Sequence, residues 1–381
     1  MSNLVPDALP EGIPPGPVET AAAPADPAPV QATRRFPLHP NFWWALLWCV
    51  GALLFTQVPG AVVTIGVLLG AVFLQFIALD DLGSTETLFS HPVGLVAVGA
   101  GVVAAHLLLI GMALLCLRLI AGRDWHRQVA LRWPAFSHVL LVLLMVPAFM
   151  VLAHGGYYLF RHVLHLPSML DMLGGGMEQV ERSFGGMPLL AGALLIGVMP
   201  GLSEELWCRA FLGRGIVGRH GYLLGVLGTS FLFGLIHVDP CQGGMAMLVG
   251  MILHFIYLTS RSLLIPMVLH FLNNSLAVAS TSLPQRAILL PEGEPAPWFL
   301  YLAAGLALLA IGWTLYQSRA RLATLPGAEP WQPPFPGVTC PPSDSATVVA
   351  TPFPSLVNIG LVSTALAFFV VAVWLILQAG G

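Results

Sequence analysis

Three short stretches of the chain carry polar side chains whose spacing could support chemistry. The first is EELWCR, in which Glu204 and Glu205 follow a run of apolar or small residues. Glu205 and Arg209 are four residues apart with the acid first, the favourable order for an ion pair on a helix. Arginine does not readily lose its proton, so in an apolar setting it needs a carboxylate partner. Glu204 points about 100° away around the helix. It is left without a local cation, which makes it the candidate general base or acid.

The second stretch is FGLIH and the third is HFLNN. Phe233 and His237 share one helical face, so the aromatic ring can shield one side of the imidazole. His270 and Asn274 also share a face, and a histidine beside an amide donor can bind a metal, transfer a proton or stabilise an oxyanion. Taken alone, each stretch is also explained by packing or by hydrogen bonds between helices. We expect that simpler role for Asn273, which lies off the face.

The composition places these residues in a membrane. Of the 381 residues 57% are hydrophobic and 9% are charged, whereas about a quarter of the residues of a soluble protein are charged. Apolar runs long enough to cross about 30 Å of hydrocarbon as helices recur along the chain. We therefore predict an all-α fold, a polytopic transmembrane bundle of about 8–9 helices with a central polar cavity. The lipid bilayer is the expected partner, and without a basic patch we expect no nucleic acid.

The predicted spans are 42–78, 93–119, 137–160, 188–212, 222–239, 242–260, 263–283, 297–317 and 354–378. The first is awkward, because its residues would form a helix about 55 Å long. TQVPG within it could kink one element or turn a hairpin.

All basic residues are arginines, and they decide between these alternatives, since cytoplasmic loops are enriched in them. With a single tilted or broken first element and a cytoplasmic N-terminus, only three loop arginines face outward, namely Arg161, Arg182 and Arg286. The cytoplasmic side then holds Arg34, Arg35, Arg118, Arg123, Arg127, Arg132, Arg214, Arg219, Arg261, Arg319 and Arg321. We therefore favour the single element and expect a multi-pass protein, typical of a bacterial inner membrane.

Depth along the predicted spans supports grouping the three stretches. Glu204 and His237 lie about 22 and 24 Å from the inner helix ends, and His270 and Asn274 about 12 and 18 Å. The four side chains could converge near mid-membrane, toward the cytoplasmic half, as a site that activates water. Glu204, His237 and His270 also form the ligand set of a catalytic zinc, so Zn²⁺ is left open as a cofactor.

The three motifs, EExxxR, FxxxH and HxxxN on separate membrane helices, resemble those of the CPBP intramembrane proteases. That family includes the type II CAAX prenyl endopeptidases and bacterial Abi-type relatives. The resemblance implies a helix bundle around a conical cavity, with Glu204 and His237 activating water and His270 and Asn274 completing the site. It also implies that Glu205 and Arg209 support the site, with Phe233 beside His237.

On this basis the organisation predicted is a disordered Pro/Ala-rich tail (1–40), N-terminal transmembrane helices with an interfacial segment (41–184), a CPBP/Abi catalytic core (185–283), a further transmembrane helix (284–321), a Pro-rich linker (322–352) and a C-terminal transmembrane helix (353–381).

The function predicted is an intramembrane endopeptidase, of metallo- or glutamate type, acting on membrane-associated peptides or proteins. The alternative is a non-proteolytic scaffold or bacteriocin-immunity protein on the same fold. A transporter is less favoured because no second copy of the motif region suggests an inverted repeat. The other histidines within spans, His106, His154 and His254, have no acidic neighbour at helical spacing, and we expect them to pack.

Overall fold

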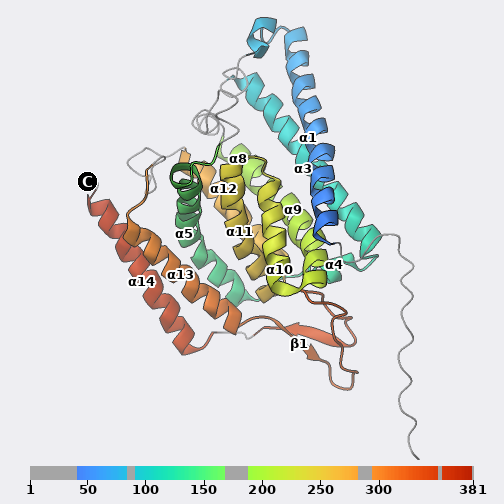
Figure 1. Ribbon diagram of the computed structural model, residues 1–381, viewed down its shortest axis with the longest axis vertical. Helices are drawn as coiled ribbons and strands as arrows, with labels where there is room; N and C mark the ends of the chain where they lie inside the picture. The colour runs from blue at the N-terminus through green and yellow to red at the C-terminus, as the bar shows by residue number, and fades with distance from the viewer. Residues whose placement is uncertain (1–40, 84–90, 168–187, 282–293, 351–353, 380–381) are drawn as a thin grey trace, which may run out of the picture. The chain divides into compact units, whose positions relative to one another are not determined.

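The computed structural model describes residues 41–83, 91–167, 188–281, 294–350 and 354–379. Figure 1 shows a bundle built almost entirely of helices. In chain order the elements are α1 (Phe42–Phe73), η1 (Leu79–Gly83), α3 (Pro92–Ile120), α4 (Trp125–Gln128), α5 (Phe136–Tyr158), η2 (Leu159–Val163), α8 (Leu189–Gly192), η3 (Ala193–Val198), α9 (Met199–Glu205), η4 (Leu206–Gly213), α10 (Arg214–Leu235), α11 (Pro240–Ser260), α12 (Leu264–Thr281), α13 (Trp298–Gln317), β1 (Arg321–Thr324), β2 (Ala346–Val349) and α14 (Leu356–Ala379).

The first predicted span is one helix, as expected, and not a hairpin. Pro59 lies inside α1 without ending it. The helix packs along α3 (Figure 1), and two glycines permit a close crossing. A Cβ atom added to Gly60 would lie 2.9 Å from the carbonyl oxygen of Gly101, and one added to Gly101 would lie 2.7 Å from that of Gly60. Only glycine fits at both positions, so the crossing fixes how α1 and α3 face each other.

The segment from α8 to α10 is a continuous helical run with one sharp break. The break is at Gly221, whose φ of 78° and ψ of −178° are not helical and are readily adopted by glycine alone. At 47 residues, an unbroken run would be about 70 Å long, more than twice the thickness of the hydrocarbon layer. The break therefore divides the run into two crossings, as the spans 188–212 and 222–239 predict, although α10 already ends at Leu235.

Two parts of this run, η3 and η4, are π-helical. π-Helical turns are wider than α-helical turns and are frequent at functional sites. Here they flank α9, the short helix that carries both glutamates.

The lengths and composition of the helices confirm the predicted fold class, an all-α polytopic membrane bundle. Among the described residues, seven helices are long and apolar enough to cross a membrane, with α10 counted together with the run before it. Residues 264–280 of α12 form a shorter apolar helix. Many large side chains on the outer faces are exposed and apolar, including Phe73, Leu309 and Trp374, as lipid-facing residues must be.

Two buried clusters hold the bundle together. One packs α1, α3, η4 and α10 around the fully buried Trp207 and Phe233. The other packs α5, α11, α12, α13 and α14. The motif helices lie between these clusters, so burial from both sides fixes the polar side chains that they carry.

The region predicted as a Pro-rich linker is more ordered than expected. Strand β1 pairs with β2 in antiparallel register, with Arg321 opposite Val349. The intervening chain docks on a set of arginines at one end of the bundle. Arg127 and Arg261 donate to the carbonyl oxygens of Pro341 and Thr339 at 3.3 and 3.4 Å. The segment has too few apolar residues to form a core of its own, and these hydrogen bonds help to hold it against the bundle.

The other domain boundaries stay predictions. The tail 1–40 lies outside the described residues, as do Arg182 and Arg286. The predicted interfacial segment contains the short helix α4, and Trp133 beyond it is 83% exposed.

Candidate active site

The EExxxR motif forms a buried ion pair, which confirms the predicted partner of Arg209. The Arg209 guanidinium lies 3.0 Å from Glu205 Oε1, and both side chains are almost completely buried. The guanidinium also stacks over the Phe233 ring at 4.3 Å and donates to the carbonyl oxygen of Gly250 at 3.2 Å. The carboxylate, the aromatic face and the carbonyl oxygen each compensate part of the cost of burying this charge.

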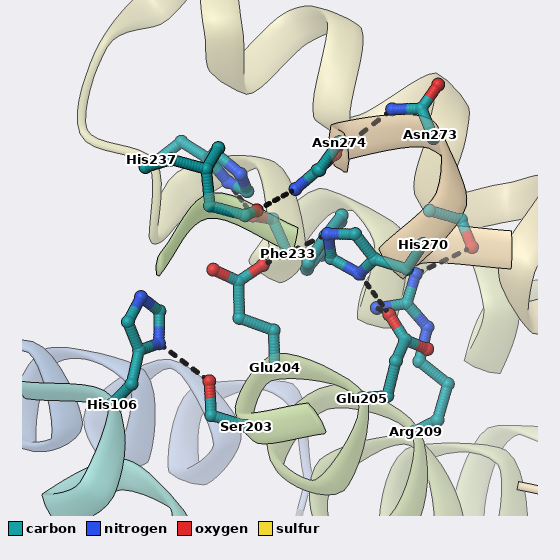
Figure 2. A network of polar contacts seen from close by, with 12 residues as sticks. His106, Ser203, Glu204, Glu205, Arg209, Phe233, His237, His270, Asn273 and Asn274 are labelled. Atoms are coloured by element: carbon teal, nitrogen blue, oxygen red, sulfur yellow. Dashed lines mark hydrogen bonds and ion pairs between the residues drawn. The ribbon is translucent and has the colours of Figure 1, made fainter. Parts of the chain in front are cut away.

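His270 bridges the two glutamates from α12 (Figure 2). Its Nδ1 lies 2.9 Å from Glu205 Oε1, and its Nε2 lies 3.9 Å from Glu204 Oε2. Because Glu205 is already paired with Arg209, it accepts a hydrogen bond from Nδ1–H and leaves Nε2 facing Glu204. Helices α9 and α12 approach closely here, since a Cβ atom on Gly201 would lie 3.2 Å from the backbone nitrogen of Phe271.

Glu204 differs from its neighbour in being partly accessible. Its side chain is 14% exposed, whereas that of Glu205 is completely buried. Its Oε2 has no hydrogen-bond partner among the described residues, and its contact with His270 Nε2 exceeds hydrogen-bond distance. One carboxylate is therefore locked in an ion pair and the other is available, as the helical spacing predicts.

His237 lies just beyond the end of α10, in the turn before α11. Its Nδ1 lies 2.8 Å from the carbonyl oxygen of Phe233. Since a carbonyl oxygen only accepts, Nδ1 carries the proton and Nε2 is the basic nitrogen. The Phe233 ring meets the imidazole edge-on with centroids 5.0 Å apart, the predicted shielding. The next residue, Val238, has a φ of 64°, a strained conformation for a β-branched residue, so surrounding contacts hold this turn.

Two hydrogen bonds fix the side chain of Asn274. Its Nδ2 donates to the carbonyl oxygen of Ile196 in η3 at 3.0 Å. Its Oδ1 accepts from Asn273 Nδ2 at 3.0 Å. Asn273 therefore bonds within its own helix, and the hydrogen bond between helices expected of it is made by Asn274, which ties α12 to the run that carries the glutamates.

A cavity of about 70 Å³ brings some of the predicted residues together. This is room for a few water molecules. Glu204 and His237 line it, whereas His270 and Asn274 do not. The remaining lining residues come from α1, α3, η4 and the turn after α10, namely Ala52, Leu53, Thr56, Gln57, Ala105, His106, Leu109, Trp207 and Ile236.

The sequence predicts only a packing role for His106, and it does not predict that this residue lines the cavity. His106 lines it beside Glu204, and its Nδ1 lies 2.7 Å from the hydroxyl of Ser203. No residue near His106 in the sequence signals this position. Its partner Ser203 lies on another helix, 97 residues further along the chain. The other two histidines have packing contacts: Nδ1 of His154 is 3.3 Å from the Tyr301 hydroxyl, and His254 is 1% exposed.

The side chains are not arranged as a zinc site. Among the described residues, no three His, Cys, Asp or Glu side chains lie close enough to hold one metal ion. In the candidate set of Glu204, His237 and His270, the last does not line the cavity. Glu204, His237 and water are the groups that the cavity brings together.

Fold and site together define a polytopic membrane protein in which a carboxylate and an imidazole line one small cavity. Residues 186–276, about a quarter of the chain, match the family model described as "Type II CAAX prenyl endopeptidase Rce1-like". This segment carries all three motifs, and the match supports the resemblance to the CPBP family of intramembrane proteases that the motifs predict. No curated protein and no solved structure matches the chain.

Proposed function

We propose that this protein is an intramembrane endopeptidase of the glutamate type that hydrolyses a peptide bond of a membrane-associated peptide or protein. The observation that supports the proposal most strongly is the cavity, which has room for a few water molecules and is lined by both Glu204 and His237. A membrane protease needs water, a base and a reacting carbonyl in one enclosed place.

In the proposed mechanism Glu204 and His237 hold one water molecule between them. Glu204 takes a proton from this water, and the hydroxide oxygen adds to the scissile carbonyl carbon. The carbonyl oxygen becomes an oxyanion. The C–N bond then breaks, its electron pair stays on nitrogen, and the proton held by Glu204 passes to the departing amine. The first products are a carboxylic acid and an amine, with Glu204 restored as a carboxylate; the acid then passes its proton to the amine, which leaves a carboxylate and an ammonium group.

Arg209, Glu205 and His270 are proposed to keep Glu204 in position. With Glu205 neutralising Arg209, His270 presents Nε2 to Glu204 at 3.9 Å. In this tautomer Nε2 carries no proton, so a small movement would let it accept a hydrogen bond from the Glu204 carboxyl once Glu204 has taken the proton of the water.

His270 and Asn274 are also proposed to stabilise the oxyanion, His270 as an imidazolium because its Nδ1–H is bonded to Glu205. The support is their position on one face of α12 beside Glu204. Since neither lines the cavity, this role requires substrate binding to open the contact between Asn274 and Ile196.

We propose that the arginine-rich end of the bundle is cytoplasmic, with the N-terminus on that side, in a bacterial inner membrane. One support is the distribution of arginines between the two sides of the membrane. The other is that Arg127, Arg214 and Arg261 all contact the β1–β2 segment at one end of the bundle.

The test compares membrane-peptide profiles of cells that express wild-type protein, Glu204→Gln or Glu329→Gln. Glu329 is exposed in the β1–β2 segment and controls for the loss of one carboxylate. We expect cleavage products that are present with wild type and Glu329→Gln and missing with Glu204→Gln. Identical profiles for all three, with equal protein levels, would contradict proteolysis and favour the scaffold alternative.

A further inference from the structure

His106 occupies a position that the proposed mechanism has not used. It projects from α3 toward α9, and Figure 2 shows Glu204 between His106 on one side and His270 on the other. Its imidazole lines the same cavity as Glu204 and His237. His106 therefore lines the cavity with Glu204 and His237, although it belongs to none of the three motifs.

The contact with Ser203 orients this imidazole. Ser203 is completely buried and directly precedes Glu204. A helical serine commonly bonds to the carbonyl oxygen four residues earlier, but among the described residues the recorded partner of this hydroxyl is His106 Nδ1, at 2.7 Å. The hydroxyl therefore serves the histidine, and Nε2 is the ring nitrogen left for the cavity.

The tautomer follows from the donors available. When the Ser203 hydroxyl donates to Nδ1, the neutral ring carries its proton on Nε2. The cavity then has a fixed N–H donor opposite Glu204. A neutral imidazole can polarise a carbonyl and stabilise the oxyanion that forms from it.

Few other side chains can supply that donor. Thr56 donates its hydroxyl to the carbonyl oxygen of Ala52 at 2.8 Å. His270 and Asn274 stand outside the cavity lining. Nδ1–H of His237 is occupied by the Phe233 carbonyl, and its Nε2 is needed for water. Gln57 and the Trp207 indole also bring N–H groups to the lining. His106 differs from them in having its ring oriented by the hydroxyl of the residue that directly precedes Glu204.

We propose that His106 is a further catalytic residue whose Nε2–H donates a hydrogen bond to the oxyanion, with Ser203 as the positioning residue that sets its tautomer. No bond to His106 forms or breaks in this role. The inference rests on the proposed function, since it needs Glu204-dependent cleavage.

The test uses a synthetic peptide that spans a cleavage site found in the Glu204→Gln comparison, with purified full-length protein. His106→Leu should lower kcat by about 10²–10³-fold, the effect of losing one oxyanion donor, with KM nearly unchanged. His106→Gln keeps an N–H donor and should recover at least part of the rate. Ser203→Ala should fall between His106→Leu and wild type. His154→Leu, another histidine within a span, is the control and should cleave at the wild-type rate.

The outcomes separate the two proposals. If no cleavage product depends on Glu204, the proposed function is wrong, and so is the inference that rests on it. If Glu204-dependent cleavage exists but His106→Leu cleaves within about threefold of wild type, well short of the expected loss, only the inference is overturned. Equal losses for His106→Leu and His106→Gln, with matching losses of thermal stability, would show a packing role and overturn it as well.

Discussion

At the scale of single residues, two adjacent glutamates have opposite environments. Glu205 is fully buried and shared between Arg209 and His270. Glu204, one position earlier, lines a cavity, and its side chain is 14% exposed. The difference arises because successive helical residues point in different directions, so one carboxylate stabilises the structure and the other is available for chemistry.

Thermal melts in detergent should distinguish the two carboxylates. Glu205→Gln should destabilise the protein by about 3–5 kcal/mol, because it leaves the buried charge of Arg209 without its partner. Glu204→Gln should change stability little, since it removes no ion pair at hydrogen-bond distance. A larger loss of melting temperature for Glu204→Gln than for Glu205→Gln would contradict these assignments.

The sequence predicts contacts at this scale only where they are local. The pair Glu205–Arg209 and the contact of Phe233 with His237 each span four residues, so helix geometry alone gives them. The contacts of His106 with Ser203 and of His270 with Glu205 join different helices. They depend on how the bundle packs, which no spacing along the chain encodes.

At the scale of helices, close crossings place the cavity. Thr56 and Gln57 on α1, and Ala105 and His106 on α3, lie near the contact between Gly60 and Gly101 and line the cavity together. The crossing therefore sets where His106 stands relative to Glu204.

Widening this crossing should impair the site. Gly101→Val would force the backbones of α1 and α3 apart, and overpacking of this kind costs about 1–3 kcal/mol. We expect a lower melting temperature and slower peptide cleavage. Gly111→Val is the matched control on the same helix, since a Cβ atom at Gly111 has nothing within 4 Å. Equal behaviour of the two variants would refute the role of the crossing.

Hydropathy predicts the elements well and their ends less well. Apolar runs give the spans because each must cross the same hydrocarbon layer. The run to 239 overextends α10, which ends at Leu235, so His237 lies in a turn and not inside a helix. The β1–β2 pair is missed because its strands are four residues long, in a segment whose composition is typical of a linker.

At the scale of the whole bundle, the site residues lie at different distances from the arginine-rich end. The turn with His237 precedes α11, whereas Arg261 follows the other end of that helix. Toward the arginines, the buried side chains of η4, including Trp207 and Phe211, fill the interior. His270, by contrast, lies in the half of α12 nearer to Arg261, so the site residues span the middle of the bundle.

Cysteine labelling in intact cells should reveal which end of the bundle is cytoplasmic. Val238→Cys, in the exposed turn beside His237, should react with a membrane-impermeant maleimide, and Glu329→Cys should react only after permeabilisation. Both variants are made with Cys340 replaced by serine, although burial raises the pKa of the Cys340 thiol and so slows its reaction. The reverse labelling pattern would place the turn with His237 at the cytoplasmic face.

The most direct test of the central claim follows the oxygen of the attacking water. Membranes that contain wild-type protein are incubated in water labelled with a heavy oxygen isotope, with a chelator present, and the new peptide C-termini are analysed by mass spectrometry. Hydrolysis through Glu204 predicts C-termini with one heavy oxygen for wild type and none of these C-termini for Glu204→Gln. The same labelled C-termini in both samples, or in neither, would contradict the assignment of this cavity as a hydrolytic site.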